Sequence, residues 1–182
     1  CILDYGLGNT KSLYNSLKKI GSKPQFYSEN DSKNYDIIFI PGVGSFSEAS
    51  RLLKDKKLNI FLKEAKKNSF IFGICLGMQI LFTKGFENGE CKGLDFIGGE
   101  VKIIKSKEKK IILPIVGYQK INIQNNNFKF FNSYNNKKFY FVHSFAIQKI
   151  KKELEIAKSN FGGKKFISAI KKNNLIGFQF HP

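Results

Sequence analysis

The feature that most constrains the fold of this chain is a cysteine between two glycines at residues 73–77, Gly-Ile-Cys-Leu-Gly. A strand-like apolar run begins at Phe70 and leads into the motif, and a helix-like amphipathic run follows it. The pattern is the thiol form of a nucleophile elbow, in which the reactive side chain lies on a strained strand-to-helix turn, exposed at the carboxyl end of a sheet. Glycine is needed on both sides because neighbouring Cβ atoms would crowd the turn.

Cys75 can be interpreted in two ways. A cysteine on a hydrophobic strand is most often an inert, buried core residue. The two flanking glycines and the abrupt change from strand to helix periodicity favour a nucleophile instead. A helix that begins directly after Cys75 also directs its free N–H groups and the positive end of its dipole at the sulfur, which favours the thiolate.

The first half of the chain predicts alternating strands and helices. Residues 35–40 form a nearly continuous apolar run, typical of a central parallel strand that is covered on both faces. Ser45 and Glu48 have the spacing of a capping box at the start of a helix. With short connections, these elements predict a compact α/β sheet. The expected strands are residues 1–5, 25–27, 35–40 and 70–74, and the expected helices are residues 10–20, 45–53, 58–65 and 76 to near 85.

The second half of the chain changes to short alternating strands and turns. Asn173 and Asn174 lie between two such strands and predict a tight hairpin. We expect this half to extend the sheet with antiparallel strands, and because no linker is visible, residues 1–182 are predicted to form a single domain. The lysine-rich runs at residues 105–110 and 149–152 are interpreted as solvated hairpin tips. The expected strands are residues 100–105, 118–123, 138–142, 154–157, 166–170 and 176–180.

Composition argues against several function classes. The formal net charge of +17 invites a nucleic-acid interpretation, but Arg51 is the single arginine, whereas phosphate and base recognition favour arginine's planar fork. The three cysteines have neither paired nor zinc-type spacing and fit a reducing cytoplasm. No apolar stretch is long enough to cross a bilayer, and no signal peptide is visible. The sequence starts without methionine, and we expect both ends to be trimmed.

Residues 41–44, Pro-Gly-Val-Gly, follow the expected central strand at its carboxyl end. Such a sequence is most often a simple tight turn. Its glycines also allow peptide N–H groups to face a neighbouring strand end, which is how an oxyanion hole is built beside a nucleophile. If the strands that precede this loop and Cys75 are neighbours, the two loops lie side by side.

Only two histidines are available to serve Cys75 as a base. A cysteine nucleophile needs a group that removes its proton and protonates the leaving group, and histidine does both near neutral pH. His143 lies in an apolar run, where a structural and a functional role are about equally expected. His181 follows a strand-like run, and the carboxyl ends of strands are where an α/β sheet collects its reactive groups. His181 is therefore the better candidate.

Five sequence blocks follow one another along the chain. They are Asp-Tyr-Gly-Leu-Gly-Asn at residues 4–9, the block at 41–44, Gly-Ile-Cys-Leu-Gly-Met-Gln at 73–79, Tyr-Phe-Val-His-Ser at 140–144 and Gly-Phe-Gln-Phe-His-Pro at 177–182. Together they resemble the class I glutamine amidotransferases, and most of all the family of glutaminase subunits of imidazole glycerol phosphate synthase. The resemblance implies a flavodoxin-like α/β fold, with a mostly parallel central sheet flanked by helices and an antiparallel extension in the C-terminal half.

The resemblance also implies a glutaminase reaction. In this family Cys75 corresponds to the nucleophile that attacks the side-chain carboxamide of glutamine, and His181 to the base that moves the protons. Ammonia leaves, and water hydrolyses the remaining thioester to glutamate. The resemblance places the oxyanion hole at the backbone N–H groups of Val43, Gly44 and Leu76, and the residues that match the glutamine pocket are Gly42, Gly77, Gln79, His143, Ser144 and Phe145.

The expected partner is a HisF-like synthase subunit with a barrel fold, bound as a heterodimer. In the family this subunit takes the ammonia into imidazole glycerol phosphate, in histidine biosynthesis. No metal, organic cofactor, nucleic acid or membrane is expected to take part, and the protein is expected in the cytoplasm. Such glutaminases are nearly inactive until the partner binds its substrate, so the loop at residues 41–44 is interpreted as a switch as well as an oxyanion hole.

The chain departs from the family pattern in three places. The family's catalytic glutamate follows the histidine by two residues and so lies beyond Pro182, where the sequence ends. Residues 114–119, Pro-Ile-Val-Gly-Tyr-Gln, replace the Pro-His-Met-Gly-Trp-Asn of the partner-facing edge, and Phe145 replaces a tyrosine. Three alternatives stay open: an ammonia donor to another synthase, such as one that amidates a surface sugar, a regulatory relative that does not hydrolyse glutamine, and a stand-alone thiol hydrolase.

Overall fold

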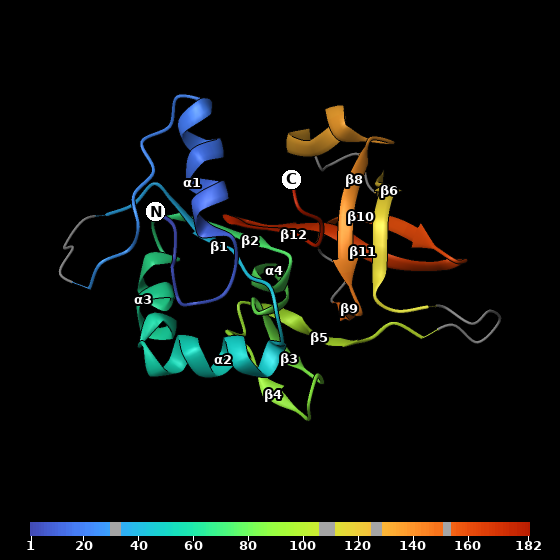
Figure 1. Ribbon diagram of the computed structural model, residues 1–182, viewed down its shortest axis with the longest axis horizontal. Helices are drawn as coiled ribbons and strands as arrows, with labels where there is room; N and C mark the ends of the chain where they lie inside the picture. Colours follow the sequence, from blue (N-terminus) through green and yellow to red (C-terminus); the bar gives the residue numbers. More distant parts are fainter. Residues whose placement is uncertain (30–33, 106–111, 125–128, 151–153) are drawn as a thin grey trace.

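The computed structural model describes residues 1–29, 34–105, 112–124, 129–150 and 154–182, and Figure 1 shows their arrangement. A six-stranded sheet organises them. Its first three strands are parallel, and each later strand is antiparallel to the one before it. In spatial order the strands are β1 (Ile37–Ile40), β2 (Phe70–Ile74), β12 (Leu175–Phe178), β11 (Lys164–Lys172), β10 (Glu155–Phe161) and β7 (Asn122–Ile123).

The parallel part of the sheet continues beyond β1 through single bridges. Ile2 pairs in parallel with Phe39 of β1 and, on its other side, with Phe26. The strands expected at residues 1–5 and 25–27 are therefore present as isolated bridges rather than as full strands. The predicted α/β fold, with a parallel centre and an antiparallel extension, is confirmed.

Three helices flank the parallel strands. In Figure 1, α1 (Thr10–Lys19) lies on one side of β1 and β2, and α2 (Phe46–Asp55) and α3 (Leu58–Ala65) lie on the other. The Ser45 side chain caps α2 by accepting a hydrogen bond from the Glu48 N–H at 3.3 Å, as its sequence position predicts. The buried faces of α2 and α3 join the larger of two hydrophobic clusters. None of the helices in the described ranges has the length and apolar character to cross a membrane.

The helix after Cys75 is much shorter than expected. α4 (Leu76–Gln79) makes about one turn, and the chain then forms β3 (Phe82–Gly85), where the sequence predicted helix to near residue 85. Residues 80–82 are completely buried, and an apolar run that is buried on all sides shows neither helical nor strand periodicity. β3 pairs with two strands that come later in the chain, and this non-local pairing decides its conformation.

The second half of the chain forms more than an extension of the central sheet. β7, β10 and β11 extend it as predicted, but the other strands build two further sheets. The predicted hairpin turn lies between β11 and β12, where Asn173 has a φ of 54°. Of the two lysine-rich runs, residues 106–110 and 151–152 lie outside the described residues, whereas Lys149 and Ile150 belong to strand β9 (Phe145–Ile150) and not to a hairpin tip. The additional elements are β4 (Cys91–Lys92), β5 (Ile97–Ile103) and β9 (Phe145–Ile150), which form a sheet with β3, the paired β6 (Ile115–Lys120) and β8 (Lys138–His143), and the 3-10 helix η1 (Lys129–Tyr134).

The ends of several strands meet at one place. The chain passes from β8 to β9, and so from one sheet to another, across the single residue Ser144. His181, which follows β12, pairs with Tyr140 of β8, and its N–H donates a hydrogen bond to the Tyr140 carbonyl oxygen at 3.0 Å. This bridge joins the segment after β12 to the β6–β8 sheet, and it brings the carboxyl ends of the parallel strands to the junction of β8 and β9.

Candidate active site

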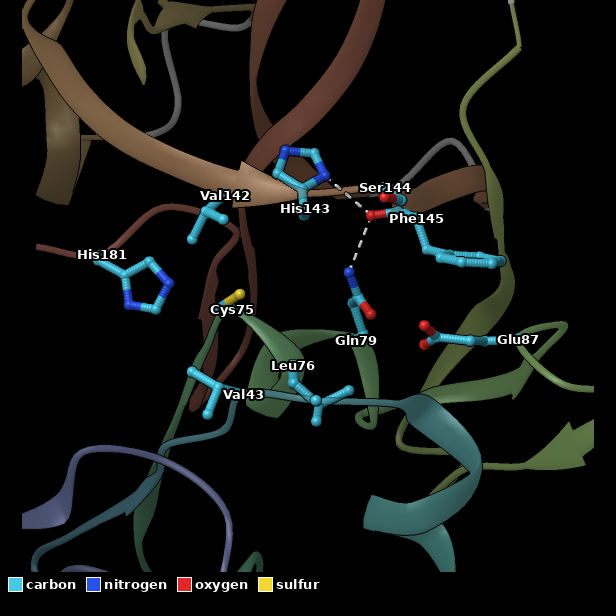
Figure 2. A pocket seen from close by; sticks show the side chains of 11 residues that line it. Val43, Cys75, Leu76, Gln79, Glu87, Val142, His143, Ser144, Phe145 and His181 are labelled. Carbon is cyan, nitrogen blue, oxygen red and sulfur yellow. Dashed lines mark hydrogen bonds between the residues drawn. The ribbon is translucent and has the colours of Figure 1, made fainter. Parts of the chain in front are cut away.

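A cavity of about 190 Å³ lies where the carboxyl ends of the parallel strands meet the junction of β8 and β9. Figure 2 shows side chains from both parts of the chain converging on it. Nine of its eleven described lining residues were expected from the sequence. These nine are Val43, Gly44, Cys75, Leu76, Gln79, His143, Ser144, Phe145 and His181, and the other two are Glu87 and Val142.

The backbone of Cys75 is strained, as the elbow pattern predicts. Its φ of 53° and ψ of −109° lie in a region that residues other than glycine rarely adopt. Both flanking glycines are required by close contacts: a Cβ on Gly73 would meet the Gly77 carbonyl oxygen, and a Cβ on Gly77 would collide with the Ile40 carbonyl oxygen. The steric argument from the sequence is therefore confirmed, and it extends to the contact of α4 with β1.

Cys75 carries a protonated thiol at rest. The residue is 6% exposed, so the exposed side chain expected of the elbow is wrong. Burial raises the pKa of Cys75 to about 11. Hydrogen bonds from the Leu76 N–H and the Gln179 side chain act in the opposite direction, as expected at the start of a helix. A helix as short as α4, of four residues, does not outweigh the loss of water around the sulfur.

His181 lines the cavity beside Cys75 (Figure 2). Its Nε2 is buried and has no hydrogen-bond partner in the described part of the chain. Burial lowers the pKa of His181 below its usual 6.5, so the ring is neutral at pH 7. A neutral imidazole with an unpartnered nitrogen next to a thiol has the properties that a general base needs.

The loop at residues 41–44 lies beside the elbow. β1 and β2 pair in parallel with Ile40 opposite Gly73, so the two loops leave the sheet next to each other, as the sequence predicted for neighbouring strands. Val43 and Gly44 line the same cavity as Cys75. The 41–44 loop and Cys75 therefore border one cavity, as the hypothesis of an oxyanion hole requires.

Tyr5 holds this loop from behind. Its side chain is completely buried, and its hydroxyl donates a hydrogen bond to the Pro41 carbonyl oxygen at 2.7 Å. A Cβ on Gly42 would lie 2.7 Å from the same hydroxyl, so the loop packs directly on Tyr5. Gly42 and Gly77 were expected in the glutamine pocket, but neither is among the lining residues, because both are used in close packing behind the cavity wall.

His143 is a structural residue of the cavity wall. Its Nδ1 lies 2.9 Å from the Phe145 carbonyl oxygen, and because a carbonyl only accepts, Nδ1 carries the proton. Burial lowers the pKa of His143 to about 4, so the ring stays neutral at pH 7. The same carbonyl accepts a hydrogen bond from Gln79 Nε2 at 2.9 Å. The junction of β8 and β9 is thereby fixed to α4.

Glu87 was not singled out by the sequence. It is the single acidic side chain among the described lining residues, and Figure 2 shows it at the opposite end of the cavity from His181. Its carboxylate accepts a hydrogen bond at 2.9 Å from the N–H of Phe46, at the start of α2, where the helix dipole favours a negative charge. In the sequence Glu87 belongs to a polar loop, and no local pattern marks it. Across the described residues, no group of three potential metal ligands occurs.

Known proteins match the whole chain. The family described as glutamine amidotransferase class-I matches residues 1–182. The imidazole glycerol phosphate synthase subunit HisH of Carboxydothermus hydrogenoformans is 38% identical over 183 residues, covering 100% of this chain and 89% of that protein. The imidazole glycerol phosphate synthase subunit HisH of Chlorobaculum tepidum is 35% identical over 183 residues, covering 100% of this chain and 90% of that protein.

Solved structures share the fold. A crystal structure of a glutamine amidotransferase has a TM-score of 0.74 at 12% identity, covering 100% of this chain and 89% of that chain. A crystal structure of a glutamine amidotransferase from Thermotoga maritima has a TM-score of 0.65 at 16% identity, covering 99% of this chain and 74% of that chain. At these identities the likeness concerns the fold alone. By sequence along its full length, and with a cysteine elbow in the matching fold, this chain belongs to the class I glutamine amidotransferases and, within them, to the family of HisH subunits.

Proposed function

We propose that this chain is the glutaminase subunit of an imidazole glycerol phosphate synthase, which hydrolyses glutamine and delivers ammonia to a synthase partner in histidine biosynthesis. The observation that carries the proposal is the convergence of Cys75, His181 and the 41–44 loop on one cavity. Its volume of about 190 Å³ is below the roughly 300 to 1,000 Å³ of sites for drug-sized ligands, which suits a free amino acid.

The proposed reaction assigns a role to each of these groups. His181 removes the proton of Cys75, and the sulfur attacks the side-chain carbonyl carbon of glutamine. Backbone N–H groups of Val43, Gly44 and Leu76 stabilise the negative charge that develops on the carbonyl oxygen. His181 returns the proton to the amide nitrogen, ammonia leaves, and water hydrolyses the glutamyl thioester to glutamate.

Glu87 is proposed to bind the α-ammonium group of glutamine. Its carboxylate lies at the end of the cavity opposite His181 in Figure 2, so a substrate held there by its ammonium group extends its carboxamide toward Cys75. A hydrogen bond between two charged groups is stronger than a neutral one and fixes the orientation of the substrate. Gln79 lies between the two ends in Figure 2, and Phe145 lines the cavity on the side of Glu87.

The raised pKa of Cys75 fits an enzyme that is inactive until its site is activated. A thiol with a pKa of about 11 is almost entirely protonated at pH 7, and only the thiolate is an effective nucleophile. This state fits a glutaminase that is nearly inactive alone and is activated when its partner binds.

The partner is proposed to dock on the exposed face of the β6–β8 sheet. Val116 pairs with Val142 and Tyr118 with Tyr140, and each of the four residues is more than one-third exposed. Val142 also lines the cavity, so this apolar face reaches the active site. A HisF-like barrel that covers the face receives ammonia without releasing it to water.

A second candidate function is ammonia donation to a different synthase. Residues 114–119 depart from the family pattern, and β6, which contains most of them, forms half of the proposed docking face. A changed docking face favours a changed partner, such as a synthase that amidates a surface sugar.

The test measures glutamate formation by the purified chain alone, with the HisF-like subunit of the same organism and its substrate, and with a sugar-amidating synthase. We expect strong activation by the HisF-like subunit and complete loss in the Cys75→Ala variant. Activation by the other synthase alone assigns the second function. If glutamine is not hydrolysed in the presence of either partner, the glutaminase assignment is contradicted and the chain is a regulatory relative. Labelling of Cys75 by peptide or aldehyde probes, but not by a glutamine-analogue electrophile, assigns a stand-alone thiol hydrolase.

A further inference from the structure

Gln179 is a completely buried polar residue behind the nucleophile. It directly follows β12, is 0% exposed and is not among the described residues that line the cavity. Its Nε2 donates a hydrogen bond to Cys75 Sγ at 3.8 Å, a long distance that suits the large sulfur atom. Because Gln179 does not reach the cavity, any effect it has on a reaction passes through the sulfur.

The orientation of the Gln179 amide is fixed by a backbone carbonyl. The Phe145 carbonyl oxygen accepts from Gln79 Nε2 at 2.9 Å, so this end of the Gln79 amide must be its NH₂ group. The same nitrogen donates to Gln179 Oε1 at 3.0 Å. With its oxygen turned to Gln79, Gln179 must present its own NH₂ group to Cys75. The Phe145 carbonyl oxygen, which can only accept hydrogen bonds, thus fixes the orientation of both side-chain amides.

His143 strengthens this polarity. Its Nδ1–H donates to the same Phe145 carbonyl oxygen at 2.9 Å, so both lone pairs of that oxygen are used. Reversing the Gln79 amide places its oxygen against a carbonyl oxygen. Gln79 and Gln179 are 4% and 0% exposed, so water cannot replace the lost hydrogen bonds.

We propose that Gln179 is a further catalytic residue of the glutaminase, whose NH₂ group stabilises the Cys75 thiolate while Gln79 and the Phe145 carbonyl hold it in the donating orientation. A donor favours the thiolate because a hydrogen bond to an ionised acceptor is stronger than one to a neutral acceptor. No proton moves along this chain of hydrogen bonds, and His181 remains the base. The proposal rests on the proposed function only for its effect on turnover, since the ionisation of Cys75 can be measured without substrate.

The surroundings of Cys75 contain few other groups that could account for such an effect. Among the described residues, the titratable side chains that share its cavity are His143, His181 and Glu87, and Tyr5 lies behind it. None of these is changed in the test below. If Gln179 were only a satisfied buried amide, its replacement would change stability and leave the ionisation of Cys75 as it is.

The experiment measures the rate of alkylation of Cys75 by iodoacetamide at fixed pH values between 7 and 10, all below its pKa of about 11, with peptide-resolved mass spectrometry on the full chain. In Gln179→Met, a variant of similar shape without a donor, we expect the pKa of Cys75 to rise by about one unit. Alkylation at pH 8 then slows by about threefold, since a more basic thiolate is also more nucleophilic. The free cysteines Cys1 and Cys91 serve as internal controls in the same sample and should keep their rates.

A second variant tests the hydrogen bond that orients Gln179, and a third is its control. Gln79→Met leaves Gln179 in place but removes the donor that orients it, so we expect a smaller shift in the same direction. Gln124→Met, an exposed glutamine whose Nε2 donates to the Asn122 carbonyl oxygen, is the matched control and should change nothing. If the alkylation rate of Cys75 at each pH is the same in Gln179→Met as in the wild type, the proposal is overturned. If that variant does not fold, an unchanged profile in Gln79→Met overturns it instead.

Turnover separates this inference from the proposed function. With the synthase partner present, we expect Gln179→Met to lower kcat by about threefold or more and to leave KM for glutamine unchanged, because Gln179 does not contact the substrate. A rise in KM at constant kcat contradicts the assignment. A wild-type chain that lacks glutaminase activity under every condition removes the proposed function, while the alkylation result on Cys75 still decides the role of Gln179.

Discussion

Cys75 combines a strained backbone with a buried side chain. The positive φ arises where α4 packs on the ends of β1 and β2, and the same packing excludes water from the sulfur and raises its pKa. The strain and the protonated thiol therefore share one structural cause. A nucleophile held in this way is protected from alkylation and oxidation until the site is activated, because both reactions require the thiolate.

Replacing Cys75 by glycine and by alanine separates strain from packing. Both variants lack the sulfur and should be inactive. Glycine adopts a φ of 53° without strain and alanine does not, so we expect Cys75→Gly to exceed Cys75→Ala by about 1 kcal/mol in free energy of unfolding. Urea unfolding followed by circular dichroism measures the difference. An alanine variant as stable as the glycine variant would show that the observed φ stores no strain.

Glu87 is expected to control substrate affinity rather than chemistry. Glu87→Gln keeps an acceptor for the Phe46 N–H but removes the charge that faces the ammonium group of glutamine. We expect KM for glutamine to rise by about tenfold or more, the value of a hydrogen bond to a charged group, with little change in kcat. Steady-state kinetics with the partner present provide the measurement.

The matched control for this prediction is Glu90→Gln. Glu90 lies on the same loop, but its side chain is exposed and pairs with Lys84 outside the cavity. It should leave KM unchanged. Equal effects of the two substitutions would show that general charge, and not a contact with the substrate, is responsible.

At the scale of elements, the 41–44 loop depends on a residue far earlier in the chain. Tyr5→Phe removes the buried donor of the Pro41 carbonyl oxygen and leaves that oxygen without a partner. We expect a loss of about 1 to 3 kcal/mol in the free energy of unfolding, and a lower kcat because the loop that carries Val43 and Gly44 loses its anchor. Tyr14→Phe, on α1 and away from the cavity, is the control.

Denaturant unfolding and steady-state kinetics check the two parts of this prediction separately. A variant with lower stability but an unchanged kcat would show that Tyr5 supports the fold and does not position the loop. A loss of kcat in the Tyr14 variant as well would point to a general effect of removing a hydroxyl.

The elements also show where sequence periodicity is informative. α1, α2 and α3 have one apolar face, and their positions were predicted closely. Residues 80–82, directly after α4, are completely buried and show no periodicity, and strand β3, which begins at Phe82, was predicted as helix for that reason. β9 was not predicted at all, because it directly follows β8 and changes sheet at Ser144 without a turn sequence.

At the scale of the whole molecule, His143 links stability to pH. The folded protein holds its pKa at about 4, whereas the unfolded chain binds the proton near pH 6.5. Its contribution to stability is therefore complete above pH 6.5 and is lost as the pH falls toward 4. We expect this to amount to about 3 kcal/mol, and to be absent in His143→Gln, which keeps a donor for the Phe145 carbonyl oxygen.

Urea unfolding of both proteins at a series of pH values provides the test. Because carboxylates titrate in the same range, the informative quantity is the difference between wild type and variant, which should narrow between pH 6.5 and 4. A constant difference would show that His143 is not buried as a neutral ring.

The sequence by itself indicated the elbow at Cys75, the loop beside it and His181, the two residues proposed as the catalytic pair. These depend on steric and chemical demands within a few residues: glycine on both sides of Cys75, and a histidine directly after a strand. The tertiary structure alone decided that Cys75 is protonated at rest, that Glu87 closes the far end of the cavity and that Gln179 faces the sulfur. Burial, pKa and amide orientation arise from groups that are distant in the chain, 41 residues apart for Glu87 and Phe46 and 104 for Gln179 and Cys75, and no local pattern records them.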